Sequence, residues 1–282
     1  MRTAHKIRLA RTAYRVVHAF RGIFGGNDAV SLERRGIRWE LDLREGIDFA
    51  IYLFGAFELS LVRFYSARIR PGDVVLDIGA NVGAHTVPIA RLVGSSGKVF
   101  AFEPTDYAVS KLRKNLLANS QASRVVTIEQ AFLVANEDAG VAKEIYSSWP
   151  LTAEPGSHAL HLGTAKSTSG ARAETLDHYL AKRGVERVDW IKLDVDGYEH
   201  AVLAGGRKTL SRFKPKILME FAPYLAEEAG YSFGEILGWL REEGYRGIEV
   251  ENRVPVPLEA DALRKRIPAG SSINVYLEAR PA

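Results

Sequence analysis

The chain has 282 residues, and its 38 Lys and Arg against 34 Asp and Glu give a formal net charge of +4. It contains no cysteine, which excludes a disulfide framework and a thiolate-held metal site. Hydrophobic residues make up 46% and charged residues 26% of the chain, a composition that is typical of a globular protein and excludes wholesale disorder.

The first predicted element is a basic helix at the N-terminus. Ile7, Ala10, Tyr14 and Val17 recur on one side of it, and arginines surround them. Such a helix either packs on the domain with its polar side in solvent, or contacts anionic lipid or an acidic partner. The sequence leaves both interpretations open.

A short β-hairpin is expected next, over residues 31–50, with Arg35 and Gly36 at its turn. The helix and the hairpin form a predicted N-terminal extension, residues 1–54, before the main domain, residues 55–282. No run approaches the roughly 20 apolar residues that cross a bilayer. The basic start also lacks the apolar stretch of a secretory signal, so we expect a cytoplasmic protein without a transmembrane segment.

From Asp73 onward, short apolar runs alternate with helical patterns. The expected strands are 74–78, 98–102, 125–128, 188–193 and 217–221, and the expected helices lie near 83–93, 106–119, 198–211 and 231–242. Because each helix returns the chain to the same direction, these strands run parallel in an α/β sandwich. Two further strands, 245–250 and 273–278, can pair antiparallel. A polar loop at 147–173 is either a lid or specificity element or a disordered surface segment.

A glycine-containing turn follows the first of these strands. Asp77 and Gly79 precede Asn81 and Gly83, after which a helix opens. Glycines at a strand-to-helix turn let the backbone approach a ligand and leave helix N–H groups facing it. The second strand ends in Glu103, which lies 103 − 83 = 20 residues beyond Gly83 and can accept both hydroxyls of a ribose. A nucleotide-like ligand is therefore expected at this turn.

The spacing of this turn favours S-adenosylmethionine over a dinucleotide. A dinucleotide site needs G-x-G-x-x-G, whereas this turn reads G-x-x-x-G with Asn81 in place of the middle glycine. Asp77 at the strand end would repel a diphosphate but suits a cationic ligand. S-adenosylmethionine carries a ribose diol, a sulfonium cation and no phosphate, so it fits these residues better.

Three ionisable residues alternate with apolar ones near the end of the fourth strand. Lys192, Asp194 and Asp196 share one strand face for as long as the chain stays extended. A central strand is normally buried, so these charges need partners or a ligand. Since ligands bind outside the carboxyl ends of parallel strands, Asp194 and Asp196 are expected beside Asp77 and Glu103. A structural ion pair followed by a helix cap is the alternative interpretation.

Several segments together resemble the FkbM family of S-adenosylmethionine-dependent methyltransferases. The resemblance covers about residues 55–221 and rests on GAFE from Gly55, VVLDIGANVG from Val74, FEP from Phe102, TLD from Thr175, IKLDVDGYE from Ile191, VLAG from Val202 and MEF from Met219. It implies a class I methyltransferase with a Rossmann-like, mostly parallel sheet of seven strands, the last one antiparallel. It also implies methyl transfer to a hydroxyl of a sugar or natural product. Asp196 departs from the family pattern, in which a glutamate is common.

The resemblance further implies roles for individual residues in binding S-adenosylmethionine. Glu103 would hold the ribose, Ala131 would lie near the adenine, and Glu58 would approach from the helix that precedes the glycine turn. The residues that would hold the methionine end are Asp77, Gly79, Asn81 and Gly83.

A hydroxyl that accepts a methyl group must lose its proton, so a general base is expected. Asp194 is the first choice, Asp196 and Glu220 are alternatives, and Lys192 is included because it can pair with Asp194 or bind a ligand. His85 could also serve, although a lone histidine in a helix is more often structural. No metal is predicted, although Asp194 with Asp196 could bind magnesium and an acceptor.

Other functions are less favoured by the sequence. An RNA methyltransferase would suit the positive net charge, but the excess is modest and no Asn/Asp-Pro-Pro-aromatic tetrad occurs. The missing G-x-G-x-x-G disfavours a dehydrogenase, and a non-catalytic module that keeps the cofactor pocket is a third alternative. The favoured partner is a small-molecule hydroxyl acceptor, which His158 and His161 could touch.

Overall fold

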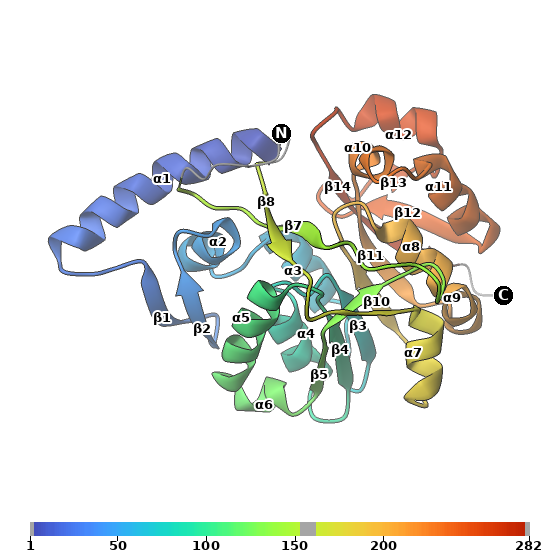
Figure 1. Ribbon diagram of the computed structural model, residues 1–282, viewed down its shortest axis with the longest axis horizontal. Helices are drawn as coiled ribbons and strands as arrows, with labels where there is room; N and C mark the ends of the chain where they lie inside the picture. Colours follow the sequence, from blue (N-terminus) through green and yellow to red (C-terminus); the bar gives the residue numbers. More distant parts are fainter. Residues whose placement is uncertain (1–2, 153–161, 280–282) are drawn as a thin grey trace.

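An eight-stranded sheet with helices on both faces forms the body of the protein, as the computed structural model shows (Figure 1). The structure describes residues 3–152 and 162–279, so His158 and His161 lie outside the described residues. The strand order is β13-β12-β14-β11-β10-β3-β4-β5. This order confirms the prediction of an α/β protein with a mostly parallel sheet.

Five parallel strands form one part of the sheet and reach its edge at β5: β3 (Val74–Ile78), β4 (Lys98–Phe102), β5 (Val126–Glu129), β10 (Trp190–Leu193) and β11 (Lys216–Phe221). The last strand, β14 (Ile273–Ala279), lies antiparallel between β11 and β12 (Tyr245–Glu249). These seven strands are the ones that the sequence predicts. The eighth, β13 (Pro255–Val256), is a short addition at the edge, where a proline is tolerated because its nitrogen has no hydrogen to donate.

Each face of the sheet has its own apolar cluster. Trp190, Val75 and Val99 belong to the cluster on one face, whereas Leu193 and Phe221 belong to the other. The first face is covered by α4 (Thr86–Val93), α5 (Asp106–Leu117) and α6 (Ser120–Ser123). The second is covered by α7 (Leu176–Lys182), α8 (Glu199–Gly205), α9 (Arg207–Phe213), α10 (Pro223–Glu228), α11 (Phe233–Glu242) and α12 (Ala260–Arg266).

The N-terminal part packs onto the first face. It consists of α1 (Thr3–Ile23), β1 (Ala29–Arg34), β2 (Ile37–Asp42), α2 (Gly46–Phe54) and α3 (Leu59–Ser66). Tyr14 of α1 and Trp39 of β2 join the same apolar cluster as Val75. The helix is therefore packed on the domain, and the division at residue 54 stays a prediction. None of the described helices combines the length and apolarity needed to cross a bilayer.

The predicted hairpin is confirmed in its first part and wrong in its last. β1 pairs antiparallel with β2, and Arg35 and Gly36 form the turn. Residues 46–50, however, belong to helix α2, which ends at Gly55 in a left-handed conformation whose N–H donates to the carbonyl of Ile51. In the apolar run that starts at Ile47, polar residues do not recur at every second position. The absence of this alternation argues against a half-buried strand.

The stretch 147–173 is not an unbroken loop. β7 (Glu144–Ser148) pairs antiparallel with β8 (Thr164–Ser167), and β9 (Arg172–Glu174) pairs parallel with β6 (Ala131–Leu133). The segments of β8 and β9 are short and polar, so neither carries the hydrophobic alternation by which strands are recognised.

Candidate functional site

A cavity of about 470 Å³ lies where β3, β4, β10 and β11 end, on the side of α1 and α2. This is the edge at which parallel sheets bind their ligands. The cavity brings together most of the residues that the sequence analysis singled out: Glu58, Gly79, Asn81, His85, Glu103, Ala131, Lys192, Asp194, Asp196 and Glu220. Asp77 and Gly83 are not part of its lining and lie next to it in the chain.

The glycine turn brings the end of β3 close to the end of β10. Gly79 has a φ of +82°, and a Cβ placed there would overlap the carbonyl oxygen of Asp194. Gly83 has a φ of +90°, and its Cβ would lie 2.7 Å from the side chain of Leu112 on α5. Both positions therefore require glycine, for conformation and for space.

Glu103 fixes the shape of this turn from the end of β4. One carboxylate oxygen accepts hydrogen bonds from the backbone and hydroxyl of Thr105 at 2.9 and 2.6 Å, and the other accepts from the backbone of Asn81 at 3.0 Å. Burial raises the pKa of Glu103, although these three hydrogen bonds oppose the shift. A carboxylate has about four acceptor positions. The three hydrogen bonds from described residues therefore leave room on Glu103 for a ligand hydroxyl.

Asp77 lies beneath the turn and is fully buried. One of its oxygens accepts a hydrogen bond from the hydroxyl of Thr86 at 2.6 Å. The other has no hydrogen-bond partner among the described residues and lies 3.9 Å from the ammonium of Lys192. This placement links the glycine turn to β10, and direct contact of Asp77 with a ligand stays a prediction.

Lys192 stands at the centre of the charges on β10. Its ammonium lies 3.1 Å from a carboxylate oxygen of Asp194 and donates to the carbonyl of Gly79 at 3.2 Å. Burial alone would lower the pKa of Lys192, but the charges of Asp194, Asp77 and Glu58 outweigh it and raise the pKa. The lysine is therefore a buried cation that holds Asp194 in place.

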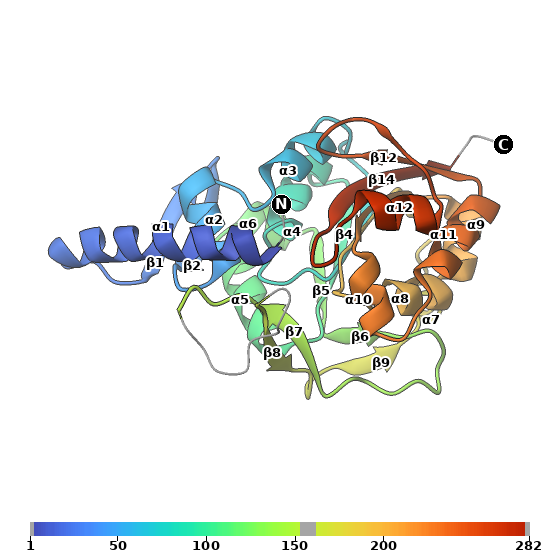
Figure 2. The ribbon, with the colours of Figure 1, turned by 90° about the horizontal axis from the view of Figure 1, so that it is seen from above.

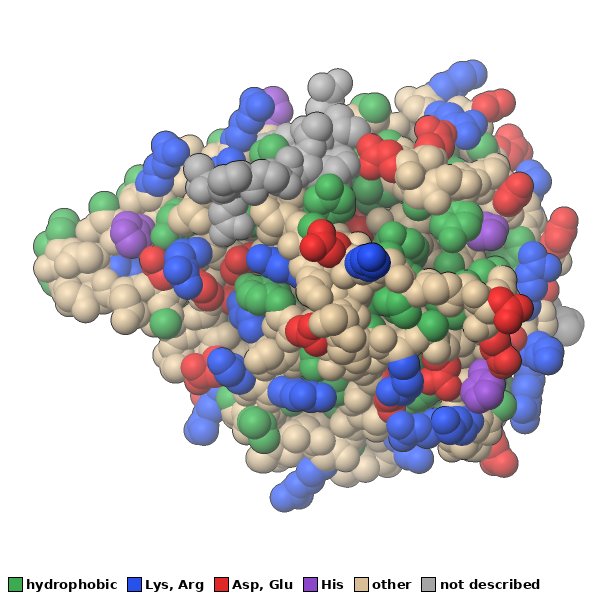
Figure 3. Space-filling model, in the orientation of Figure 1, with side chains coloured by type: hydrophobic (Ala, Val, Ile, Leu, Met, Phe, Trp, Pro, Cys, Tyr) green, Lys and Arg blue, Asp and Glu red, His purple; other side chains and the backbone are tan. Residues whose placement is uncertain are grey.

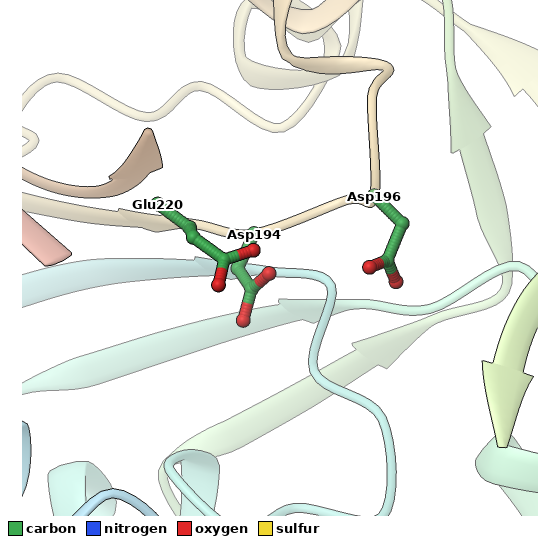
Figure 4. Close-up of side chains that lie close together, drawn as sticks. All are labelled: Asp194, Asp196 and Glu220. Carbon is green, nitrogen blue, oxygen red and sulfur yellow. The ribbon is translucent and has the colours of Figure 1, made fainter. Parts of the chain in front are cut away.

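Asp194, Asp196 and Glu220 form an acidic cluster beside this lysine. Each offers a carboxylate oxygen, and these oxygens lie within 4.8 Å of one another (Figure 4). Burial and the charge of Asp194 raise the pKa of Glu220 to about 8 and that of Asp196 well above its ordinary value. The raised pKa values favour the protonated form of Asp196 and Glu220, and a cationic group or a metal ion beside them would stabilise their ionised form.

A loop that follows β10 positions Asp196. Asp196 and Gly197 have φ values of +50° and +105°, so the extended strand has ended before this point. Glu199 accepts hydrogen bonds from the backbone of Val195 and Gly197, both at 3.1 Å, and burial raises its pKa to about 7. The sequence prediction that Lys192, Asp194 and Asp196 share a strand face holds only up to Leu193, where β10 ends.

Glu58 enters the cavity from the start of α3 and contacts His85. The two side chains lie 3.3 Å apart, and the amide of Asn274 donates to Glu58 at 2.9 Å. Burial opposes ionisation, but His85, Asn274 and Lys192 lower the pKa of Glu58 to about 2. The ring of His85 also lies 3.4 Å from the hydroxyl of Tyr65, so this histidine is buried between two side chains.

The rest of the cavity wall is largely apolar and was not anticipated from the sequence. It is contributed mainly by the N-terminal helices and the segment around β7: Ile7, Ala10, Ile47, Ala50, Phe54, Phe57, Ile145, Trp149 and Leu151. Ser272, which donates a hydrogen bond to Glu220, was also missed. Apart from Phe57, which belongs to the GAFE segment, these residues lie outside the motifs, and no short pattern marks them.

The order of the strands, and the cavity at the edge where parallel sheets bind ligands, define a class I methyltransferase fold. In this fold one antiparallel strand, here β14, lies between two strands that run in the common direction, here β11 and β12. The family model described as "Methyltransferase FkbM domain" matches residues 77–246, which is more than half of the chain. The chain belongs to the FkbM methyltransferase family, and it is an S-adenosylmethionine-dependent methyltransferase.

Individual relatives are distant. The chain is 26% identical over 230 residues to the 31-O-demethyl-FK506 methyltransferase FkbM of Streptomyces tacrolimicus, covering 73% of this chain and 85% of that protein. It is 30% identical over 154 residues to the 2-O-methyltransferase NoeI of Sinorhizobium fredii strain NGR234, covering 51% and 61%. A solved FkbM methyltransferase from Methylobacillus flagellatus KT is 16% identical, with a TM-score of 0.45 over 79% of this chain and 48% of that one.

The residues present fit S-adenosylmethionine. Its sulfonium and ammonium groups would bring positive charge beside Asp194, Asp196 and Glu220. This charge would stabilise the ionised form of Asp196 and Glu220, whose pKa values are raised. Glu103 retains an acceptor position for a ribose hydroxyl, and the required glycine at residue 79 leaves the turn free of side-chain bulk. The assignment of each of these residues to a part of the cofactor stays a prediction.

Proposed function

We propose that the protein transfers a methyl group to a hydroxyl of a small molecule that also carries an apolar portion. The observation that carries this proposal is a single cavity that joins three different surfaces. The glycine turn and Glu103 suit the cofactor, the carboxylates of Asp194 and Glu220 suit a hydroxyl, and Phe54 and Phe57 among other side chains suit apolar groups.

S-adenosylmethionine supplies a methyl group that its sulfonium already activates for displacement. The chain's own task is to orient the acceptor, exclude water and remove the proton. We assign proton removal to Asp194, which Lys192 holds at 3.1 Å. General-base assistance of this kind is worth about 10² to 10⁴ in rate. The apolar wall would exclude water from the same space.

The names of two relatives support oxygen as the acceptor atom. One is a 31-O-demethyl-FK506 methyltransferase and the other a 2-O-methyltransferase. A sugar or another natural product therefore remains our proposed acceptor class.

The experiment is transfer of a labelled methyl group from S-adenosylmethionine to a panel of hydroxyl-bearing sugars, glycosides and polyketides. The expected product carries a methyl ether, identified by nuclear magnetic resonance. Methylation at nitrogen or carbon would contradict the proposal. With a productive acceptor and saturating S-adenosylmethionine, Asp194→Asn should lower kcat by about 10² to 10⁴; saturation is needed because loss of the Asp194 charge also weakens the attraction of the acidic cluster for the cationic cofactor. Full turnover by that variant would remove Asp194 as the base.

A further inference from the structure

Helix α1 has two apolar sides, and only one of them is covered. Ile7 and Tyr14 are 8% and 6% exposed and pack on the domain. On the opposite side, Leu9, Val16 and Phe20 are 61%, 67% and 63% exposed. Burial in the fold therefore explains one side of the helix and leaves the other unexplained.

The exposed apolar residues share one side of the helix. Leu9, Val16, Phe20 and Ile23 follow one another at intervals of seven, four and three residues, which places them on one side of an α-helix. The ring of Phe24, directly after the helix, lies 5.0 Å from that of Phe20. We call these five side chains the outer stripe. Single exposed apolar residues are ordinary, but a row of this length marks an interaction surface.

Positive charge accompanies the outer stripe. α1 contains no aspartate or glutamate, and Lys6, Arg8 and Arg15 are exposed. No ion pair joins these three side chains to a carboxylate within residues 3–152 and 162–279. Lysine and arginine side chains lie beside hydrophobic ones along the arm that α1 forms (Figure 3).

The position of α1 leaves the outer stripe accessible. In two perpendicular views the helix lies along the outside of the molecule as a straight arm, and its C-terminal end projects beyond the sheet (Figure 2). A helix that lies flat in a membrane interface has this arrangement of an apolar row flanked by basic residues.

We propose that α1 docks the enzyme on the surface of an anionic phospholipid bilayer. The outer stripe enters the boundary between head groups and acyl chains, while Arg8 and Arg15 contact the anionic head groups. A bilayer is favoured over an acidic protein because the stripe lies on the outward side of a helix at the margin of the molecule and the charges flank it rather than form one compact patch.

Docking through α1 would also bring the cavity to the bilayer. Lys6, Ile7 and Ala10 on the other sides of the same helix line the cavity. An acceptor with an apolar portion could then be taken from the membrane interface. This consequence rests on the proposed function, whereas docking itself does not.

The test is co-sedimentation of the full chain with vesicles of phosphatidylcholine containing phosphatidylglycerol, against vesicles of phosphatidylcholine alone. We expect partitioning into the anionic vesicles to be at least about tenfold stronger at low salt. It should weaken as salt shortens the Debye length from about 10 Å at 0.1 M to about 3 Å at 1 M. Equal partitioning into both kinds of vesicle, or none into either, would overturn the proposal.

Matched variants locate the contact. Phe20→Ser with Ile23→Ser should lower the partition coefficient by about a hundredfold, and Arg8→Gln with Arg15→Gln by about fivefold per charge at low salt. Leu117→Ser is the control, because Leu117 is 78% exposed at the end of α5, outside α1. Calorimetric affinity for S-adenosylmethionine should be the same in all of these variants, which shows that the fold is kept. Undiminished vesicle binding by the variant with Phe20→Ser and Ile23→Ser would contradict docking on a bilayer. A wild type that binds no vesicles but forms a dimer, which this variant converts to monomers, would contradict it as well.

Discussion

The backbone carbonyl of Asp194 occupies the space that a side chain at Gly79 would need. The glycine turn after β3 and the chain that follows β10 are therefore in direct contact. The hydrogen bond from Lys192 to the carbonyl of Gly79, at 3.2 Å, strengthens this connection.

Gly79→Ala should therefore damage both folding and cofactor binding. The forced overlap and the left-handed conformation together should lower the free energy of unfolding by about 2–5 kcal/mol, measured by urea denaturation. Gly244→Ala is the matched control, because Gly244 has the same φ of +82° and nothing within 4 Å of its Cβ position. It should cost only about 1–2 kcal/mol. Equal losses in the two variants would show that the contact with Asp194 is unimportant.

Glu103→Ala should weaken binding of S-adenosylmethionine. Loss of a hydrogen bond to a charged group predicts a Kd about 10–100-fold higher by isothermal titration calorimetry. Thr105→Val controls for the structural part of the role, because it removes one donor to Glu103 and the cap of α5. It should lower stability by about 1 kcal/mol and change the Kd little. An unchanged Kd for Glu103→Ala would refute the ribose assignment.

Much of the fold was predictable because its elements have strong local periodicity. Strands β3, β4 and β11 are mainly apolar, the glycine turn follows β3, and Glu103 follows β4. Helix α2 and strands β8 and β9 were missed, since α2 is apolar at most positions and so lacks a helical alternation, and the two strands are short and polar.

The candidate site was predictable only in part. The carboxyl ends of parallel strands meet by topology, so Glu103, Asp194 and Glu220 could be placed together from the order of strands. The apolar wall from Ile7, Phe54 and other residues could not, because it depends on how α1 and α2 pack across the cavity. The pairing of Glu58 with His85 also depends on tertiary packing.

The pKa of Glu220 makes a prediction for stability against pH. Burial and the charges of Asp194 and Glu58 raise this pKa from 4.5 to about 8. The folded state therefore binds a proton more tightly than the unfolded state, and the resulting stability is complete below pH 4.5 and lost as the pH rises through about 8. Glu220→Gln should remove this loss, so the wild type should become less stable relative to the variant between about pH 5 and pH 9, measured by thermal denaturation.

Glu243→Gln is the control for Glu220. Lys214 holds the pKa of Glu243 below its ordinary value, so the stability from this pair is lost as the pH falls rather than as it rises. A wild type whose stability relative to Glu220→Gln does not change between neutral and alkaline pH would contradict the assigned environment of Glu220.

Methyl transfer should not depend on a divalent metal. Asp194, Asp196 and Glu220 could offer oxygen ligands, but Lys192 already supplies a cation 3.1 Å from Asp194. We expect activity to survive exhaustive chelation and dialysis. Activity that disappears with chelator and returns with magnesium would show that the acidic cluster holds a metal ion.

The central claim is that the cavity at the ends of β3, β4 and β10 holds S-adenosylmethionine with its sulfonium facing the acidic cluster. A crystal structure with S-adenosylhomocysteine tests it most directly. We expect a ribose hydroxyl within hydrogen-bond distance of the Glu103 carboxylate and the sulfur on the side of Asp194. Density for the ligand outside this cavity, or a ribose that avoids Glu103, would contradict the account.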